Sequence, residues 1–379
     1  MACKFFSGAE TGDMSEVALN SGMTVQSAGS INGAYTYKCT TSNDAPFAQL
    51  SSGLNLSTAY LRAYVRVHVT TNPGTNQSGA NKGIMNLSTA AGSDIGIIEL
   101  LVTTAGALSL RARNSVASTL SGQTTIQPDT TYLLELKVVV SATVGIVEYK
   151  IDGTVAGTLS NQNTGSTNID RAYIGYSITS GSVDVYFDNL YIDDANYPGS
   201  GKCIARQGKS GTPTYDAWTK TSSQTAAQVW STTPFSATNN AALAGTGAGA
   251  QTMLTESFST TQSGHGTETI ASGNTINACK VGLIAKVSST TNPPTFSIRQ
   301  RLNGADTDLA KVLTTGDVYY EGAIFTDTLT NLNASEIGAV RGTSAATKTD
   351  TVEDVWMFVD YTAAPAAFTG GLALTGVGQ

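Results

Sequence analysis

Charged side chains are scarce in this chain of 379 residues, at 13% of the total, whereas an average globular protein has about 25%. The surface must therefore be polar mainly through Ser, Thr, Asn and Gly. The net charge is −7 at pH 7. Because phosphate contacts need clustered Lys and Arg, we expect no general nucleic-acid partner.

Long apolar runs are missing as well. No stretch approaches the about 20 residues that span a bilayer, so we expect no membrane partner. The opening residues MACKFF lead directly into SGAE, without the apolar core of a secretory signal. We therefore expect a protein that is made in the cytosol and either stays there or leaves by lysis or a non-classical route.

Cysteine and histidine are rare, with four and two residues. No pair of cysteines has the CxxC spacing of a zinc site. The cysteines fall two in each half of the chain, which permits bridges Cys3–Cys39 and Cys203–Cys279, with four free thiols in a reducing compartment as the alternative. Neither histidine has a G-x-S-x-G partner, so the sequence does not predict a nucleophilic triad.

What the chain does contain is 39 glycines and many short segments with alternating apolar residues. This pattern predicts an all-β, antiparallel fold. The clearest strands are Tyr60–Val69 and Val183–Asp194, and the second slips by one residue at Asp188-Asn189, as a β-bulge would. Two hairpins are expected, Ile95–Val102 with Ala107–Arg113 and Thr131–Val140 with Ile146–Ile151. A short helical turn is expected at Ser335–Val340.

The domain boundary follows from residues 195–201, read ANYPGSG. Pro198 and the glycines beside it cannot continue a strand ladder. We expect two antiparallel, jelly-roll-like β-sandwiches at residues 1–195 and 202–362, a Pro/Gly linker at 196–201, and a flexible Ala/Gly tail at 363–379.

The first half resembles a known family. Its features are the opening FFSGAETGD, the strand YLRAYVRV at 60–67, the hairpin from YLLELK at 132–137 to VEYKIDG at 147–153, and the closing FDNLYIDD at 187–194. Over roughly residues 1–195 these motifs resemble the concanavalin A-like lectin/glucanase (laminin-G-like) jelly roll.

The second half resembles a module that follows such jelly rolls in tailed-bacteriophage virion proteins. Its features are YDAWT at 215–219, NLNASEIGAV at 331–340 and VWMFVDY at 355–361. The resemblance implies a structural protein on the virion surface, synthesised in the host cytoplasm, as a capsid decoration, cement or fibre-like protein. Its partners would be other capsid or tail subunits. We expect a homo-oligomer, and a trimer is one choice of closed symmetry. A tail-associated host-recognition protein and a free lectin or degenerate glucanase are the alternatives.

Catalysis is not predicted. Glucanases of the jelly-roll family carry an E-x-D-x-x-E pattern that places paired carboxylates on one strand face, and this chain lacks it. Glu99, Glu135 and Glu148 stand alone, and we expect them to be outward-facing strand residues. Asp184 shares a strand with Asp188, but the expected bulge separates their directions. The sequence therefore favours a binding protein over an enzyme.

Three groups of residues are candidate sites. The strand face Tyr60, Arg62, Tyr64 and Arg66 suits a sugar or a partner protein, or is covered by the chain itself. The resemblance implies a structural Ca²⁺, for which Glu10, Asp13 and Asp188 are candidate ligands, and a solvated acidic loop is the alternative. Trp218 and Trp230 are expected as anchors at an interface or in the core. No other cofactor is expected.

Overall fold

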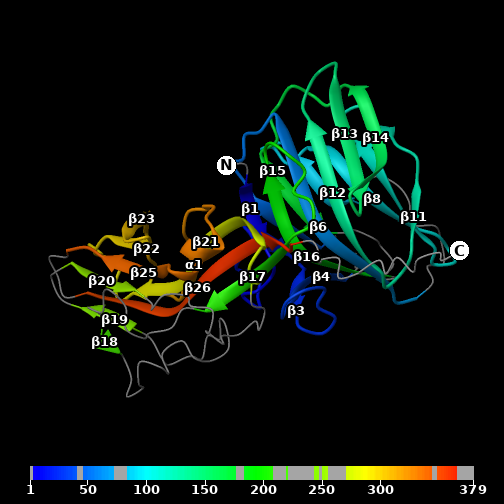
Figure 1. Ribbon diagram of the computed structural model, residues 1–379. Coiled ribbons are helices and arrows are strands. Elements are labelled where there is room, and N and C mark those ends of the chain that lie inside the picture. The colour runs from blue at the N-terminus through cyan, green and yellow to red at the C-terminus, as the bar shows by residue number, and fades with distance from the viewer. Residues whose placement is uncertain are drawn as a thin grey trace, which may run out of the picture.

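The computed structural model describes residues 3–40, 46–71, 83–175, 183–207, 219–220, 243–246, 250–254, 270–343 and 348–364. In these residues the regular structure is antiparallel β-sheet apart from one short helix, α1 (Leu329–Asn333). The predicted all-β fold is confirmed. Figure 1 shows two sandwiches side by side, which meet where β1, β16, β17 and β26 come together.

The described residues between 3 and 193 form the first sandwich from two sheets. The first sheet joins, in spatial order, β14 (Thr154–Gln162), β13 (Gly145–Ile151), β12 (Thr131–Val139), β6 (Thr58–Val69), β16 (Val183–Asp193), β4 (Thr36–Thr40) and β3 (Thr24–Gln26), with β1 (Cys3–Ser7) beside β16. The second sheet joins β10 (Thr119–Leu120), β9 (Leu108–Asn114), β8 (Asp94–Val102), β7 (Gly83–Ser88), β15 (Arg171–Gly175), β5 (Phe47–Ser51) and β2 (Leu19–Ser21), with β11 (Thr124–Ile126) beside β9.

The described residues between 202 and 362 form the second sandwich. The third sheet joins β18 (Thr219–Lys220), β19 (Leu243–Thr246), β26 (Thr349–Thr362), β21 (Thr275–Val287) and β24 (Val318–Glu321), with β17 (Lys202–Gln207) beside β26. The fourth sheet joins β20 (Gln251–Leu254), β25 (Glu336–Arg341), β22 (Phe296–Leu302) and β23 (Ala305–Lys311).

The central strands β6 and β16 of the first sheet follow the predicted alternation. Leu61, Ala63 and Val65 of β6 are buried in the core between the two sheets of the first sandwich, where each large apolar side chain contributes about 1.5–3 kcal/mol. The register of β16 against β6 shifts between Asp188 and Tyr191. Asn189 within this shift has a φ of +48°, a conformation that Asn tolerates better than most residues. The predicted β-bulge is confirmed.

The helical turn expected at Ser335–Val340 is wrong. Helix α1 ends before that segment, and its N-cap is Thr328, whose side chain accepts a hydrogen bond from the Asn331 amide. Residues Glu336–Arg341 form β25 because they pair with both β20 and β22. The alternate residues Ile337 and Ala339 then enter the core of the second sandwich.

Strand β26 is buried on both faces. Val355, Met357 and Val359 belong to the core of the second sandwich. The opposite face carries Trp356 and Phe358, which pack in a separate cluster with residues of the first sandwich. The buried residues of this cluster are Cys3, Phe6, Tyr191, Cys203, Ala205, Ala278, Trp356 and Phe358. The two sandwiches therefore share an apolar junction beyond the linker.

Candidate functional site

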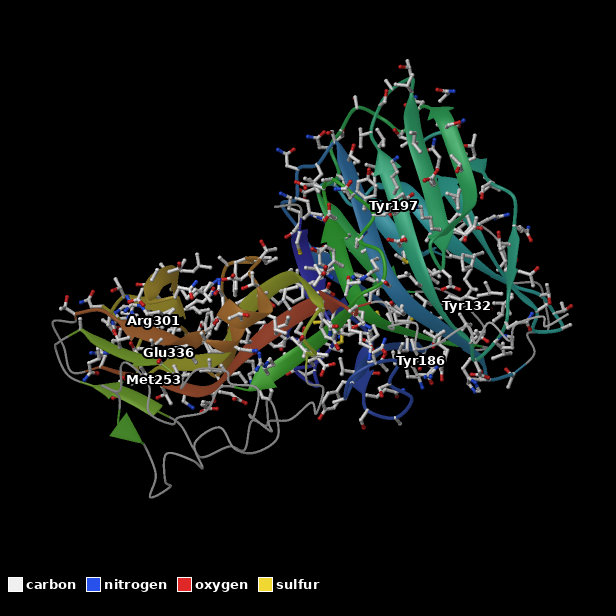
Figure 2. The ribbon with its side chains drawn as sticks, viewed as in Figure 1. Tyr132, Tyr186, Tyr197, Met253, Arg301 and Glu336 are labelled. Carbon is white, nitrogen blue, oxygen red and sulfur yellow. The ribbon has the colours of Figure 1, made fainter. Side chains whose placement is uncertain are left out.

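The predicted face on β6 points away from the core of the first sandwich, but the chain's own segments cover it. Arg62 has no exposed surface. Tyr60 packs edge-on against Tyr197 of the linker, with 5.0 Å between ring centroids. The Arg66 guanidinium lies 4.7 Å from the centroid of the Tyr186 ring, and Figure 2 shows Tyr186 and Tyr197 on the first sandwich. At Arg62, therefore, the structure matches the alternative in which the chain itself covers the strand face.

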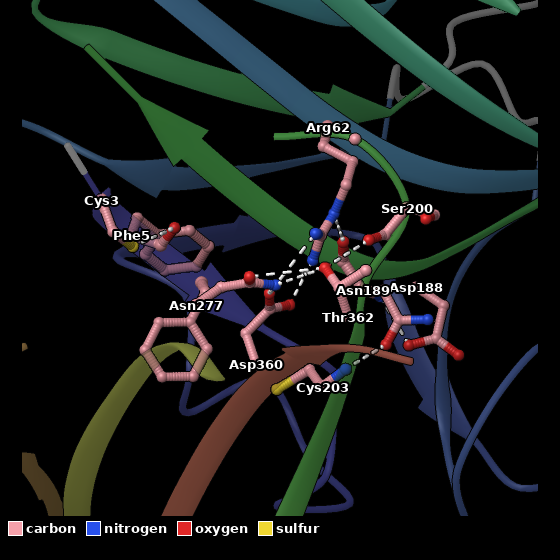
Figure 3. Close-up of polar contacts among 12 residues, drawn as sticks. Cys3, Phe5, Arg62, Asp188, Asn189, Ser200, Cys203, Asn277, Asp360 and Thr362 are labelled. Atoms are coloured by element: carbon pink, nitrogen blue, oxygen red, sulfur yellow. Dashed lines mark hydrogen bonds and ion pairs between the residues drawn. The ribbon is translucent and has the colours of Figure 1, made fainter. Parts of the chain in front are cut away.

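Arg62 forms the centre of a polar network at the junction (Figure 3). Its guanidinium makes an ion pair with Asp360 of β26, and both side chains are fully buried. Nε donates to the Asn189 carbonyl at 2.9 Å, and the Asn277 amide donates to Asp360 at 2.7 Å. Burial raises the pKa of the Asp360 carboxyl, although Arg62 acts in the opposite direction. The network joins β6 and β16 of the first sandwich to β21 and β26 of the second.

Lys280 of β21 is a second buried cation at the junction. Its Nζ donates to the Phe6 carbonyl at 2.9 Å and pairs with Glu321 at 2.5 Å. The Phe6 and Phe358 rings lie 5.0 and 5.7 Å from the same Nζ. Because a buried cation is costly unless it is paired and hydrogen-bonded, these contacts require both sandwiches to stay docked.

A pocket of about 240 Å³ opens at the same junction. Its walls include Tyr191 and Asp193 of β16, Tyr197 and Pro198 of the linker, and Asn277 of β21. Since both sandwiches supply walls, the pocket exists in this form only while they are docked.

The three carboxylates predicted as calcium ligands are not brought together. Within the described ranges, no group of three or more His, Cys, Asp or Glu side chains could hold a metal ion. Asp188 is fully buried and accepts the backbone amides of Asn32 and Asn189 at 2.8 and 2.6 Å. Asp13 instead accepts the amide of Ser15 at 2.8 Å. The oxygens of Asp13 and Asp188 thus accept backbone amides, and the three predicted side chains do not form a metal-binding group.

The remaining predicted residues divide into two sets. Trp218 and Trp230 lie outside the described residues, as does residue 365 onward of the predicted tail. The four cysteines are buried and free, so neither of the two permitted bridges is formed. Burial raises the pKa of the Cys3 thiol to about 12, which keeps it protonated.

The isolated glutamates point outward from their sheets, as expected, but two of them are not on the surface. Glu99 is 0% exposed and Glu135 is 1% exposed. Glu135 accepts the Gly199 amide of the linker at 2.7 Å. Glu99 accepts from two arginines of the neighbouring strand, and it marks a face that the sequence did not single out.

That face is the side of the second sheet that points away from the core. Five residues lie directly opposite one another across five neighbouring strands, and cross-strand partners share a face. In order they are Arg113 of β9, Ile97 of β8, Asn86 of β7, Tyr173 of β15 and Gln49 of β5. We call this set the cross-strand row. The alternate residues of the same strands, such as Leu87 and Ala172, belong to the core.

The side chains of the cross-strand row are held in place but are not fully paired. The Tyr173 hydroxyl donates to the Gln49 side-chain oxygen at 3.0 Å, and the Phe47 ring packs against Tyr173 with centroids 5.7 Å apart. Asn86 Oδ1, Arg113 Nε and the Nε of neighbouring Arg171 are buried and have no hydrogen-bond partner. Buried polar atoms are nearly always paired in folded proteins. Three such atoms that lack a hydrogen-bond partner lie on this one sheet face.

An ion-pair cluster lies beside the arginine end of the row. Glu99 accepts from Nε of Arg111 at 2.7 Å and from Nη1 of Arg113 at 3.1 Å. The Glu99 side chain is 1% exposed, against 13% and 19% for the two arginines. The buried carboxylate thus fixes the direction of two partly exposed guanidinium groups.

Sequence reasoning missed this face for a definite reason. The outward positions Arg111 and Arg113 were visible in the predicted strand Ala107–Arg113. Asn86 and Gln49 lie on β7 and β5, which the alternation did not reveal. Only the order of strands in the second sheet places these residues beside Tyr173 and Arg113.

Comparison with known proteins shows likeness of fold only. No protein-family model matches the sequence, and no curated protein matches it. Among solved structures, the Cellulose induced protein Cip1 aligns with a TM-score of 0.38 and 14% identity, over 52% of this chain and all of that one. Alginate lyase AlyC3 aligns at 0.31 and 8%, over 42% and 74%. The botulinum neurotoxin type G receptor binding domain aligns at 0.30 and 8%, over 48% and 43%.

Because these TM-scores are below 0.5, the likeness carries none of these activities to this chain. No helix in the described residues is long and apolar enough to cross a membrane.

Proposed function

We propose that this protein binds a glycan and that the cross-strand row of the first sandwich is the binding surface. The observation that carries the proposal is the set of three buried polar atoms on one sheet face that have no hydrogen-bond partner. They comprise one acceptor, on Asn86, and two donors, on Arg113 and Arg171. An unsatisfied buried polar group costs about 1–3 kcal/mol, and sugar hydroxyls both donate and accept. A glycan that reaches these atoms when it binds would therefore remove this cost.

The dimensions of the row suit an extended oligosaccharide. Neighbouring strands lie about 4.8 Å apart, so a row across five strands is about 19 Å long. Phe47 and Tyr173 supply aromatic rings at one end, which suit the apolar faces of sugar rings. Arginines supply donors at the other end. This distribution supports contact with several sugar units rather than one.

We propose binding without hydrolysis. Most glycoside hydrolases use two carboxylates on either side of the scissile bond. The carboxylate beside the row, Glu99, is buried and accepts from both Arg111 and Arg113. In this position, we propose, Glu99 orients the two arginines.

The test is glycan binding by the full chain. The fragment 1–195 is unsuitable, because it would expose the buried Arg62 and the apolar junction. We expect a hit on an array of neutral and acidic oligosaccharides, followed by calorimetry on variants. Tyr173→Phe and Asn86→Ala should each weaken binding about tenfold, equal to about 1.4 kcal/mol.

The matched control is Tyr132→Phe. Tyr132 lies on β12 of the first sheet (Figure 2), where its hydroxyl accepts the Gln127 amide at 2.9 Å. This variant should bind as the wild type does. A full chain that binds nothing on the array, or a Tyr173→Phe variant and an Asn86→Ala variant that both bind normally, would refute the proposal.

We further propose that the protein is displayed on a bacteriophage particle as a homo-oligomer beside other virion proteins. Support comes from the sequence resemblance at residues 215–219, 331–340 and 355–361. The two docked sandwiches suit such a role, because they hold the glycan-binding face at a fixed orientation to the second sandwich. Mass spectrometry of purified particles should find the chain at a fixed copy number. Its absence from the particles would contradict this placement.

A further inference from the structure

We propose that the glycan is acidic and that Arg113 binds a carboxylate of one of its sugars. This inference rests on the proposed function and names the class of ligand. The row is not evenly charged along its length. The observations that point to an acidic sugar lie at the end formed by β8 and β9.

The first observation is the orientation of the Arg113 guanidinium. Glu99 takes its Nη1 at 3.1 Å, while its Nε is buried without a partner. The Nε edge of this guanidinium therefore has no hydrogen-bond partner in the protein, and the Arg113 side chain as a whole is 19% exposed. A guanidinium edge presents parallel N–H groups that match the two oxygens of a carboxylate. A single sugar hydroxyl fills only part of that edge.

The second observation is the local charge. Arg111 and Arg113 share one carboxylate, Glu99, so this cluster has a formal charge of +1. The two arginine side chains are only 13% and 19% exposed, so water screens that charge incompletely. A ligand carboxylate would balance it, whereas a neutral sugar would not.

The third observation limits the attraction to this cluster. The whole chain carries −7, so it repels polyanions in general. At the other end of the row Arg171 has Asp170 at 3.8 Å, which offsets its charge. Recognition of an acidic glycan therefore depends on Arg113 and Arg111. The binding constant should weaken with salt as expected for about one charged contact.

The experiment compares acidic oligosaccharides with their own methyl esters. Each pair shares backbone, linkage and length, and the ester lacks the charge. Oligogalacturonate and other uronic oligomers in both forms are titrated into the full chain by calorimetry at two salt concentrations. We expect at least one acid to bind tenfold or more tighter than its ester. Arg113→Lys, which keeps the charge and loses the fork, should remove most of that preference.

The control variant is Arg301→Lys. Arg301 also pairs with a carboxylate on a neighbouring strand, Asp306 at 2.7 Å, but it lies at the far end of the second sandwich (Figure 2). It should leave the preference unchanged.

Two results would overturn the inference in different ways. If neutral glycans or the esters bind as tightly as the acids, the acidic class is wrong and glycan binding stands. If no glycan of either kind binds, the proposed function itself fails. Binding of an acid that is unchanged in Arg113→Lys and in a second variant, Arg113→Gln, would place the carboxylate elsewhere and also overturn the inference.

Discussion

Removing the charge of Asp360 should uncouple the two sandwiches. Asp360→Asn keeps the shape of the side chain but leaves the Arg62 guanidinium, which is 0% exposed, without an ionised partner. Breaking a buried ion pair from one side costs about 3–5 kcal/mol, because the remaining charge has no compensation. The reverse change, Arg62→Met, leaves Asp360 buried and should cost a similar amount.

The double variant separates this effect from loss of packing. If the two changes acted independently, Arg62→Met with Asp360→Asn would cost the sum, about 6–10 kcal/mol. With both charges gone, the main residual cost is the Asn189 carbonyl, which loses its donor at about 1–3 kcal/mol. The Asn277 amide keeps an acceptor, because the Asp360→Asn side chain retains its carbonyl oxygen and Thr362 accepts as well. The double variant should therefore cost about 1–3 kcal/mol, which corresponds to a coupling energy of about 6 kcal/mol.

The assay is urea unfolding of the four proteins, followed by circular dichroism and tryptophan fluorescence. We expect one cooperative transition in the wild type, because opening the junction would expose its buried apolar cluster and separate Arg62 from Asp360. Each single variant should split this into two transitions as the sandwiches separate before they unfold. Additive single effects, or a cost below about 1 kcal/mol for Asp360→Asn, would refute the reasoning, since Arg62 would then be in contact with water.

Three further predictions concern other groups. Burial raises the pKa of Asp350 to about 6 from an ordinary value of 3.8, so its contribution to stability is complete below pH 3.8 and is lost as the pH rises through about 6. Urea unfolding should therefore show the wild type gaining stability relative to Asp350→Asn on acidification from pH 7 to pH 4, and a constant difference would contradict this. The Tyr149 hydroxyl of the first sheet donates to the Leu110 carbonyl of the second at 3.0 Å; Tyr149→Phe should cost about 1–2 kcal/mol by the same assay, with Tyr132→Phe as the less costly control. All four cysteines are buried thiols, so a thiol reagent should label none of them in the folded protein and four in urea, and fewer than four labelled in urea without reductant would indicate a disulfide.

Much of the first sandwich was predictable because its strands are amphipathic. The alternation in β6 and the slip in β16 depend on local sequence, and the structure has both. The segment Glu336–Arg341 was less predictable. Its six residues carry too short a pattern to distinguish a helical turn from a strand, and its pairing with β20 and β22 is decided by residues far away in the chain.

The prediction about the strand face of β6 shows the same limit in the site. Alternation correctly placed Arg62 on the side away from the core of its own sandwich. It could not show that Asp360, almost 300 positions later, covers that side. In the second sheet, by contrast, nothing in the local sequence indicated that Asn86 and Gln49 share a face with Arg113.

The sequence by itself determined the all-β class, the strands with a buried face and the break near Pro198. These follow from side-chain periodicity and from backbone limits that act within a few residues. Only the tertiary structure decided which outward faces are covered and which residues form the cross-strand row. Those depend on strand order and on the docking of two sandwiches, and both are set by the burial of apolar surface between residues that are remote in the chain.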